Sequence, residues 1–284
     1  GLKGRTLLTS DGTTILGADD KAGIAEILTM IERIQTENRP HGTICVAFTP
    51  DEEIGMGAEH FNLDQFGAEY AYTLDGDSEG EIQYENFNAC KAEFEIRGFN
   101  VHPGEGKDTM INASLVAIEI NNCLPSMETP RGTEDYEGFY HLISMQGEVG
   151  EAKLNYIVRD HDKNGFEERK KTLRLIEKNL NAKWGEGTVT LKITDQYLNM
   201  KEIVEEHMHL IDHAKKACEA AGVAPLILPI RGGTDGCQLS FKGLPCPNLG
   251  TGGHAFHGPY EHISVEGMEK SVELLLALIQ EYTK

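Results

Sequence analysis

Two adjacent carboxylates, Glu52 and Glu53, directly follow an apolar segment that ends at Pro50. Neighbouring anions repel each other, so a buried acidic pair needs a cation or a proton to neutralise it. Residues 43–49 are rich in β-branched and aromatic side chains and predict a strand. The two acids therefore follow a strand end, which is where open α/β sheets build their sites. An isolated pair of glutamates is more often a solvated turn, so its meaning depends on the other residues of the chain.

Other acids and two histidines occupy comparable positions. Asp19 precedes a segment with helical spacing, and Asp75 ends a second predicted strand. A glycine-rich loop near the far end of the chain carries His254 and His257. Asp, Glu and His together form a ligand set for zinc, manganese or cobalt. Because strand ends on one edge of a sheet converge in space, these residues predict a metal site, with either histidine as a ligand.

The elements that must position these side chains alternate between strand and helix, which is typical of a largely parallel α/β sheet. The predicted elements of this part are a helix at 24–34, strands at 43–49 and 69–76, and helices at 202–221 and 264–283. From residue 87 to residue 199 the pattern changes to βαββαβ with antiparallel-type alternation. The elements predicted there are strands at 91–97, 139–146, 152–159 and 188–193 and helices at 111–123 and 166–182. We therefore expect an α/β domain from residues 1–86 and 200–284, with an inserted α+β domain at 87–199.

Composition excludes several classes of partner. The 284 residues carry a net charge of -20, from 26 basic and 46 acidic residues, which argues against nucleic acid. No apolar stretch has the length of a membrane span, so we expect no membrane partner. The six cysteines are scattered and form no Cys-x-x-Cys pair, as expected for reduced thiols in a cytoplasmic protein.

Six short motifs carry a family resemblance. In order along the chain they are GADDKAG at 17–23, TPDEEIGMGA at 49–58, LDG at 74–76, HPG at 102–104, RGGTDG at 231–236 and FHG at 256–258. They resemble the M20 family of co-catalytic zinc metallopeptidases, and the similarity spans essentially the whole chain. The resemblance implies a zinc-peptidase-type α/β domain with a mixed, mainly parallel sheet, into which a ferredoxin-like lid domain is inserted.

The resemblance also implies a ligand set for two zinc ions. Asp19 corresponds to the carboxylate that bridges the ions, and its peptide bond to Asp20 is expected to be cis. Glu53 and His257 correspond to terminal ligands of one zinc, and Asp75 to a terminal ligand of the other.

The same resemblance implies roles in hydrolysis. Glu52 corresponds to the general base, and His102 to a lid histidine that stabilises the oxyanion. Arg159 and Arg231 correspond to clamps for the terminal carboxylate of a peptide. The implied activity is a metallo-aminopeptidase that removes the N-terminal residue of tripeptides. The alternatives are another M20 hydrolase, such as a dipeptidase or an N-acyl amino-acid hydrolase, or a catalytically incomplete fragment that binds metal or peptide.

The chain departs from the family at one motif. The family has a His-x-Asp motif upstream of the bridging aspartate, and this chain has no histidine before His41. We therefore expect that the N-terminal part of the catalytic domain is missing here, and that the zinc site of Asp75 lacks its histidine ligand. A third alternative is that the inserted domain mainly pairs two copies of the chain, as a homodimer, through an exposed sheet edge.

Overall fold

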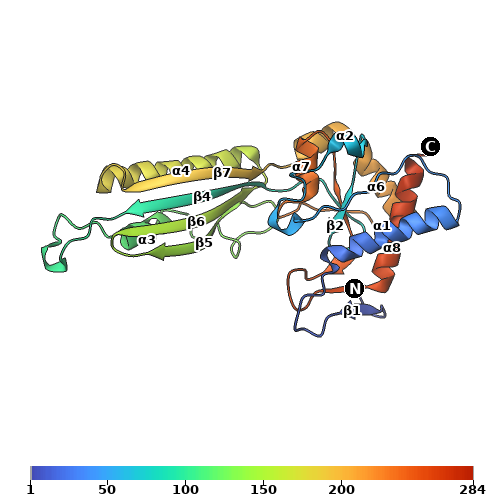
Figure 1. Ribbon diagram of the computed structural model, residues 1–284, viewed down its shortest axis with the longest axis horizontal. Coiled ribbons are helices and arrows are strands. Elements are labelled where there is room, and N and C mark those ends of the chain that lie inside the picture. The colour runs from blue at the N-terminus through green and yellow to red at the C-terminus, as the bar shows by residue number, and fades with distance from the viewer. Residues whose placement is uncertain (1, 284) are drawn as a thin grey trace. The chain divides into compact units, whose positions relative to one another are not determined.

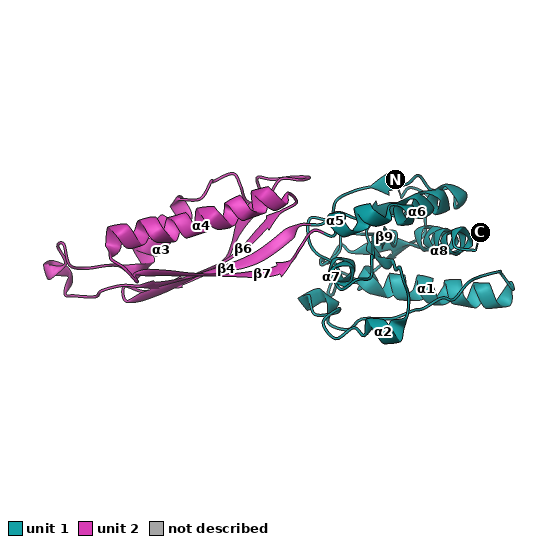
Figure 2. Cartoon of the chain, turned by 90° about the horizontal axis from the view of Figure 1, so that it is seen from above, with its two compact units in different colours: residues 1–86, 200–284 teal, residues 87–199 magenta. Residues whose placement is uncertain are grey.

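The computed structural model describes residues 2–283. The chain divides into two compact units, of which the first contains residues 1–86 and 200–284 and the second contains residues 87–199 (Figure 2). The second unit is therefore inserted into the first along the sequence.

The first unit is built on a mixed four-stranded sheet in the order β2-β9-β3-β8. Its strands are β2 (Thr73–Gly76), β3 (Glu81–Gln83), β8 (Leu226–Ile227) and β9 (Asn248–Gly250). β2 runs parallel to β9 and β3 parallel to β8, whereas β3 and β9 are antiparallel. A second, antiparallel sheet contains β1 (Leu7–Thr9), β10 (Gly253–His254) and β11 (His262–Ser264), with β11 in the centre.

The first unit also contains helices. They are α1 (Ala18–Thr36), α2 (Leu63–Phe66), α5 (Lys201–Val204), α6 (His209–Ala220), α7 (Asp235–Phe241) and α8 (Val265–Glu281). Of these, α1, α6 and α8 contact strands of its sheets. The Ser264 side chain caps α8 by accepting a hydrogen bond from the Gly267 N–H. The leucine-rich face of α8 is buried, and the helix packs against both α1 and α6 (Figure 1). Among the described residues, no helix is both long enough and apolar enough to cross a membrane.

The inserted unit is an antiparallel sheet in the order β5-β6-β4-β7 with two helices. Its elements are β4 (Asn88–Arg97), α3 (Ala113–Asn122), β5 (Phe139–Gly147), β6 (Glu151–Asp160), α4 (Lys163–Trp184) and β7 (Val189–Tyr197). Along β4, Ala92, Phe94 and Ile96 are buried while Lys91 and Glu95 are exposed, as alternation requires. The predicted βαββαβ order of the inserted unit is confirmed. The predicted fold class, an α/β domain with an inserted α+β lid domain, is also confirmed.

The strand predicted at residues 43–49 is wrong. The structure has no regular secondary structure there, and no backbone hydrogen bond among residues 2–283 involves this segment. β-branched and aromatic residues favour a strand only where another strand can pair with them. Two other predicted elements are shorter or interrupted: β2 begins at Thr73, and the helix predicted at 202–221 breaks at a 3₁₀ turn, Glu205–His207.

Candidate active site

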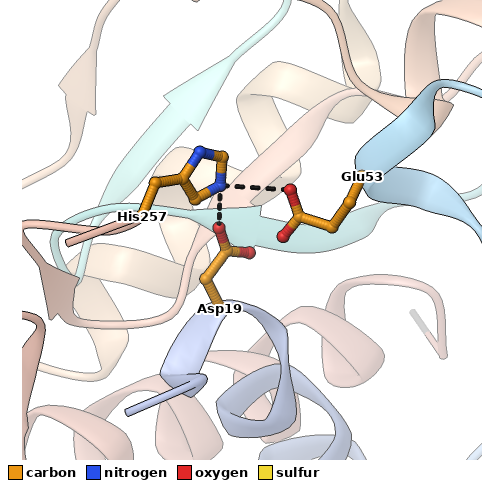
Figure 3. A group of neighbouring side chains, drawn as sticks. All are labelled: Asp19, Glu53 and His257. Carbon is orange, nitrogen blue, oxygen red and sulfur yellow. Dashed lines mark hydrogen bonds and ion pairs between the residues drawn. The ribbon is translucent and has the colours of Figure 1, made fainter. Parts of the chain in front are cut away.

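Asp19, Glu53 and His257 bring three potential metal ligands together (Figure 3). The Nε2 atom of His257 lies 2.9 Å from Oδ2 of Asp19 and 3.2 Å from Oε2 of Glu53. Asp19 comes from the first turn of α1, Glu53 from the short 3₁₀ helix Glu52–Ile54, and His257 from the loop after β10. The Glu53 and His257 side chains are exposed, so a cation can reach the three donors from solvent.

The spacing of these donors fits one small divalent cation. Zinc binds nitrogen and oxygen at about 2.0–2.2 Å, so two ligands of a tetrahedral ion lie about 3.3 Å apart. One imidazole and two carboxylates also match the chemistry of zinc ligands. Partial burial acts in the opposite direction, but Glu53 and the hydrogen bond to Asp19 raise the pKa of His257. The site therefore attracts positive charge even before a metal ion is considered.

The backbone around Asp19 is held by a residue that sequence reasoning missed. Glu261 is 1% exposed, and its carboxylate accepts hydrogen bonds from the Gly17 N–H at 2.6 Å and the Asp19 N–H at 3.0 Å. Burial alone would raise the pKa of Glu261, but these backbone donors outweigh it and lower the pKa. The Asp19–Asp20 peptide bond is cis, as the family resemblance implies. The only sequence signal for Glu261 is its place four residues after His257.

Further acids surround the three donors. Burial, followed by the charges of Asp235, Glu53 and Asp19, raises the pKa of Glu52 to about 7. Burial, followed by the charges of Asp20 and Glu52, raises the pKa of Asp75 to about 9. These carboxyl groups line a cavity of about 900 Å³ together with apolar side chains of α1 and of residues 43–49. Such crowding of acids is stabilised by protons or by cations.

Asp235 is a second residue that the sequence analysis did not single out, although it lies within the RGGTDG motif. It is 3% exposed, and neither of its carboxylate oxygens has a hydrogen-bond partner among the described residues. Its carboxylate lies against Gly57, where a Cβ atom would come within 2.2 Å of Oδ2. Its charge contributes to the raised pKa of Glu52.

The remaining predicted site residues are His102, Arg159 and Arg231. His102 is exposed in the inserted unit, and its Nδ1 atom accepts a hydrogen bond from the Gly104 N–H at 3.2 Å. Arg159, on β6 of the same unit, is 8% exposed and donates to the carbonyl groups of Cys90 and Val158 and to the Gln196 side chain. Arg231 belongs to the first unit and precedes α7.

Geometry distinguishes the two candidate histidine ligands, His254 and His257. His257 belongs to the group of three converging donors, whereas the ring of His254 packs at 5.3 Å from the ring of His262. The converging donors thus favour His257 over His254 as a ligand.

Comparison with known proteins assigns the chain to a protein family. The model of peptidase family M20/M25/M40 matches residues 14–281. The chain belongs to peptidase family M20/M25/M40. A relative within this family, peptidase T of Halothermothrix orenii, is 55% identical over 280 residues, which cover 98% of this chain and 69% of the relative.

Solved structures share the fold of this chain. The crystal structure of aminopeptidase PepT from Bacillus cereus has a TM-score of 0.85 at 28% identity and covers 98% of this chain and 74% of that chain. A tripeptidase from Staphylococcus aureus has a TM-score of 0.86 at 23% identity, over 97% of this chain and 74% of that one. The family resemblance found in the sequence is confirmed.

Proposed function

We propose that this protein is a zinc-dependent aminopeptidase that removes the N-terminal residue from tripeptides. The observation that carries the proposal is the convergence of Asp19, Glu53 and His257 from three separate segments on one point. The similarity to proteins named peptidase T over 98% of the chain supports the substrate class.

The three converging side chains would hold one zinc ion, and Asp19 together with Asp75 would contribute to a second. A zinc ion bound in this way acts as a Lewis acid and lowers the pKa of water toward about 7. We propose two ligands for the second site and three for the first, so we expect the second to bind zinc more weakly.

Glu52 is the proposed general base. It is adjacent to Glu53 but lies outside the group of converging donors, so its carboxylate is available for proton transfer. A pKa of about 7 suits a group that takes a proton from the attacking water and returns it to the nitrogen of the leaving peptide.

His102, Arg159 and Arg231 are proposed to act on the substrate. An imidazole N–H stabilises the negative charge that develops on the peptide carbonyl oxygen, and a guanidinium group matches a terminal carboxylate with two parallel hydrogen bonds. For Arg159, this role requires the guanidinium to exchange some of its bonds to Cys90, Val158 and Gln196 for bonds to the substrate.

Replacement of the proposed base tests this function. We expect Glu52→Gln to lower the rate of tripeptide hydrolysis by about 10²–10⁴-fold, because general base catalysis contributes that much. Zinc content should stay unchanged, since Glu52 is not among the converging ligands. The matched control is Glu59→Gln, an exposed acid seven residues on, which should keep wild-type rates. A rate for Glu52→Gln within a few-fold of wild type would rule out this role.

Substrate length tests the tripeptide assignment. Hydrolysis should be measured on a panel of di-, tri- and tetrapeptides and on an N-acylated tripeptide. Faster hydrolysis of dipeptides or of the acylated substrate would assign the chain to a different activity of the family.

We further propose a cytoplasmic location and a homodimer. All six cysteines are free, which suits a reducing compartment. β5 is an edge strand of the inserted unit and exposes Ile143 and Met145, as expected for a strand that pairs with a second copy. Cell fractionation and sedimentation of the purified chain test these two statements.

A further inference from the structure

The strand that carries Asp75 is irregular at that residue. β2 and β9 pair in parallel at Leu74 with Leu249 and at Gly76 with Gly250, and the register shifts between these two pairs. The Asp75 N–H is instead bonded to a side chain, because it donates to Oδ1 of Asn248 at 3.1 Å. The backbone at Asp75 is therefore fixed by one residue of the neighbouring strand.

Asn248 is itself held by a chain of buried polar groups. Its Nδ2 atom donates to Oε1 of Gln83 at 2.8 Å, and Nε2 of Gln83 donates to Oε2 of Glu81 at 3.1 Å. The other oxygen of Glu81 accepts a hydrogen bond from the Ser78 N–H at 3.1 Å. Asn248, Gln83 and Glu81 are 2%, 7% and 4% exposed, so water does not compete freely for these bonds.

The Asp75 N–H, at one end of this series of hydrogen bonds, fixes the direction of the bonds that follow it. The Asp75 N–H can only donate, so the Asn248 oxygen must face it and the Asn248 amide nitrogen must face Gln83. The Asn248 nitrogen can only donate, so the Gln83 oxygen must face Asn248 and the Gln83 nitrogen must face Glu81. Both amides are therefore locked in one orientation, and the Asn248 oxygen is permanently presented to the backbone of Asp75.

We propose that Asn248 is a positioning residue that holds Asp75 in place as a cation ligand, and that Gln83 and Glu81 hold Asn248 in turn. The inference rests on the proposed metal site, because it assigns a purpose to the backbone geometry of one proposed ligand. Partners behind a metal ligand orient it, and their removal typically costs about 10–100-fold in metal affinity.

The test compares Asn248→Leu and Gln83→Leu with the wild-type chain. Zinc binding is followed by titration calorimetry, and exchange of the Asp75 amide hydrogen is followed by NMR. Asp75→Asn is the reference variant, and we expect it to abolish zinc binding at the site of Asp75. We expect Asn248→Leu to speed exchange of the Asp75 amide hydrogen and to weaken the same zinc binding by about 10–100-fold. Gln83→Leu should weaken it less, because Asn248 keeps its oxygen. The double variant should resemble Asn248→Leu, because groups in one chain do not act additively.

The matched control is Asn181→Leu in the inserted unit. Asn181 also bonds a backbone segment through both side-chain atoms, since Nδ2 donates to the Val189 carbonyl and Oδ1 accepts from the Val189 N–H, each at 2.8 Å. A purely structural effect of losing such an amide should lower stability here too, whereas zinc binding should stay at the wild-type level.

The outcomes separate the two proposals. A wild-type chain that binds no zinc overturns the proposed function and this inference with it. Zinc binding that is lost in Asp75→Asn but intact in folded Asn248→Leu overturns the inference alone. Unchanged exchange of the Asp75 amide in Asn248→Leu also overturns it.

Discussion

Two buried glutamates near the candidate site have opposite electrostatic surroundings. Glu261 and Glu26 are each 1% exposed. Backbone N–H groups bind the carboxylate of Glu261 and lower its pKa despite burial. Neither oxygen of Glu26 has a hydrogen-bond partner within the described part of the chain, and burial together with the charge of Asp20 raises its pKa to about 10. The two pKa shifts differ in direction because backbone donors stabilise the charged form of Glu261, whereas burial favours the neutral form of Glu26.

The shift of Glu26 predicts how stability depends on pH. Between its ordinary pKa of 4.5 and about 10, Glu26 is protonated in the folded state and ionised in the unfolded state. Folding then takes up a proton, so this residue lowers the free energy of unfolding by about 1.4 kcal/mol for each pH unit of rise. Glu26→Met removes this dependence, so its stability advantage over wild type should grow from pH 5 to pH 9.

Urea unfolding at several pH values, with a chelator present, measures the effect. The control is Glu32→Met, an exposed glutamate on the same helix, which should show no such trend. A difference between Glu26→Met and wild type that does not change with pH would contradict the assigned protonation state.

At the residue scale, the sequence singled out the proposed ligands but not the residues that hold them in place. Asp19, Glu53 and His257 lie in recognisable motifs, and they converge in the structure. Glu261 was missed because its role depends on backbone groups 244 and 242 residues away, and local patterns carry no signal for such contacts. Asn248 was missed for the same reason, since its partner Asp75 is 173 residues away.

At the scale of elements, a close approach between α1 and β2 sets the distance between two proposed ligands. A Cβ atom added to Gly23 would lie 2.3 Å from the Leu74 carbonyl oxygen and 2.7 Å from the nearer Asp20 carboxylate oxygen. Only glycine lets the helix that begins near Asp19 lie this close to the strand that carries Asp75. The spacing of the acidic cluster therefore depends on a residue that has no side chain.

Gly23→Ala should destabilise the protein by about 1–3 kcal/mol, the usual effect of forcing extra atoms into a packed contact. Zinc affinity should also fall, because α1 must move away from β2. Thermal unfolding and zinc titration measure both effects. Gly42→Ala is the control, since no atom lies within 4 Å of a Cβ at that position. Full zinc affinity in Gly23→Ala would show that this contact does not set the ligand spacing.

Sequence patterns predicted elements well where their partners lie nearby. Alternation in β4 and helical spacing in α4 gave the inserted unit its correct order, because every strand there has a neighbour within the same unit. Residues 43–49 have equally favourable composition, but no strand among the described residues is hydrogen-bonded to them. Propensity alone therefore predicted a strand that pairing did not support.

At the scale of the molecule, the inserted unit has a core of its own. Its buried cluster includes Phe94, Leu154 and Leu173, all from strands and helices of residues 87–199. Its two ends also meet, because Ala89 pairs with Tyr197 across β4 and β7. A segment with its own core and adjacent ends can fold as a unit.

A fragment of residues 87–199 should therefore unfold cooperatively on its own. Circular dichroism during a urea titration measures this, and Phe94→Ala in the fragment should lower stability by about 3–5 kcal/mol, as for a buried aromatic residue. A gradual, non-cooperative transition would show that the unit needs the first unit in order to fold.

The irregular segment before Glu52 and Glu53 has a consequence for the lifetime of the protein. Residues 43–49 form no backbone hydrogen bonds among residues 2–283, and most of their side chains are exposed. Proteolytic nicking concentrates in exposed segments whose backbone is not tied down. We therefore expect limited digestion to cut this chain first between α1 and the 3₁₀ helix. That single cut would leave Asp19 on one piece and Glu53 on the other, so one continuous chain would no longer hold these two proposed cation ligands together.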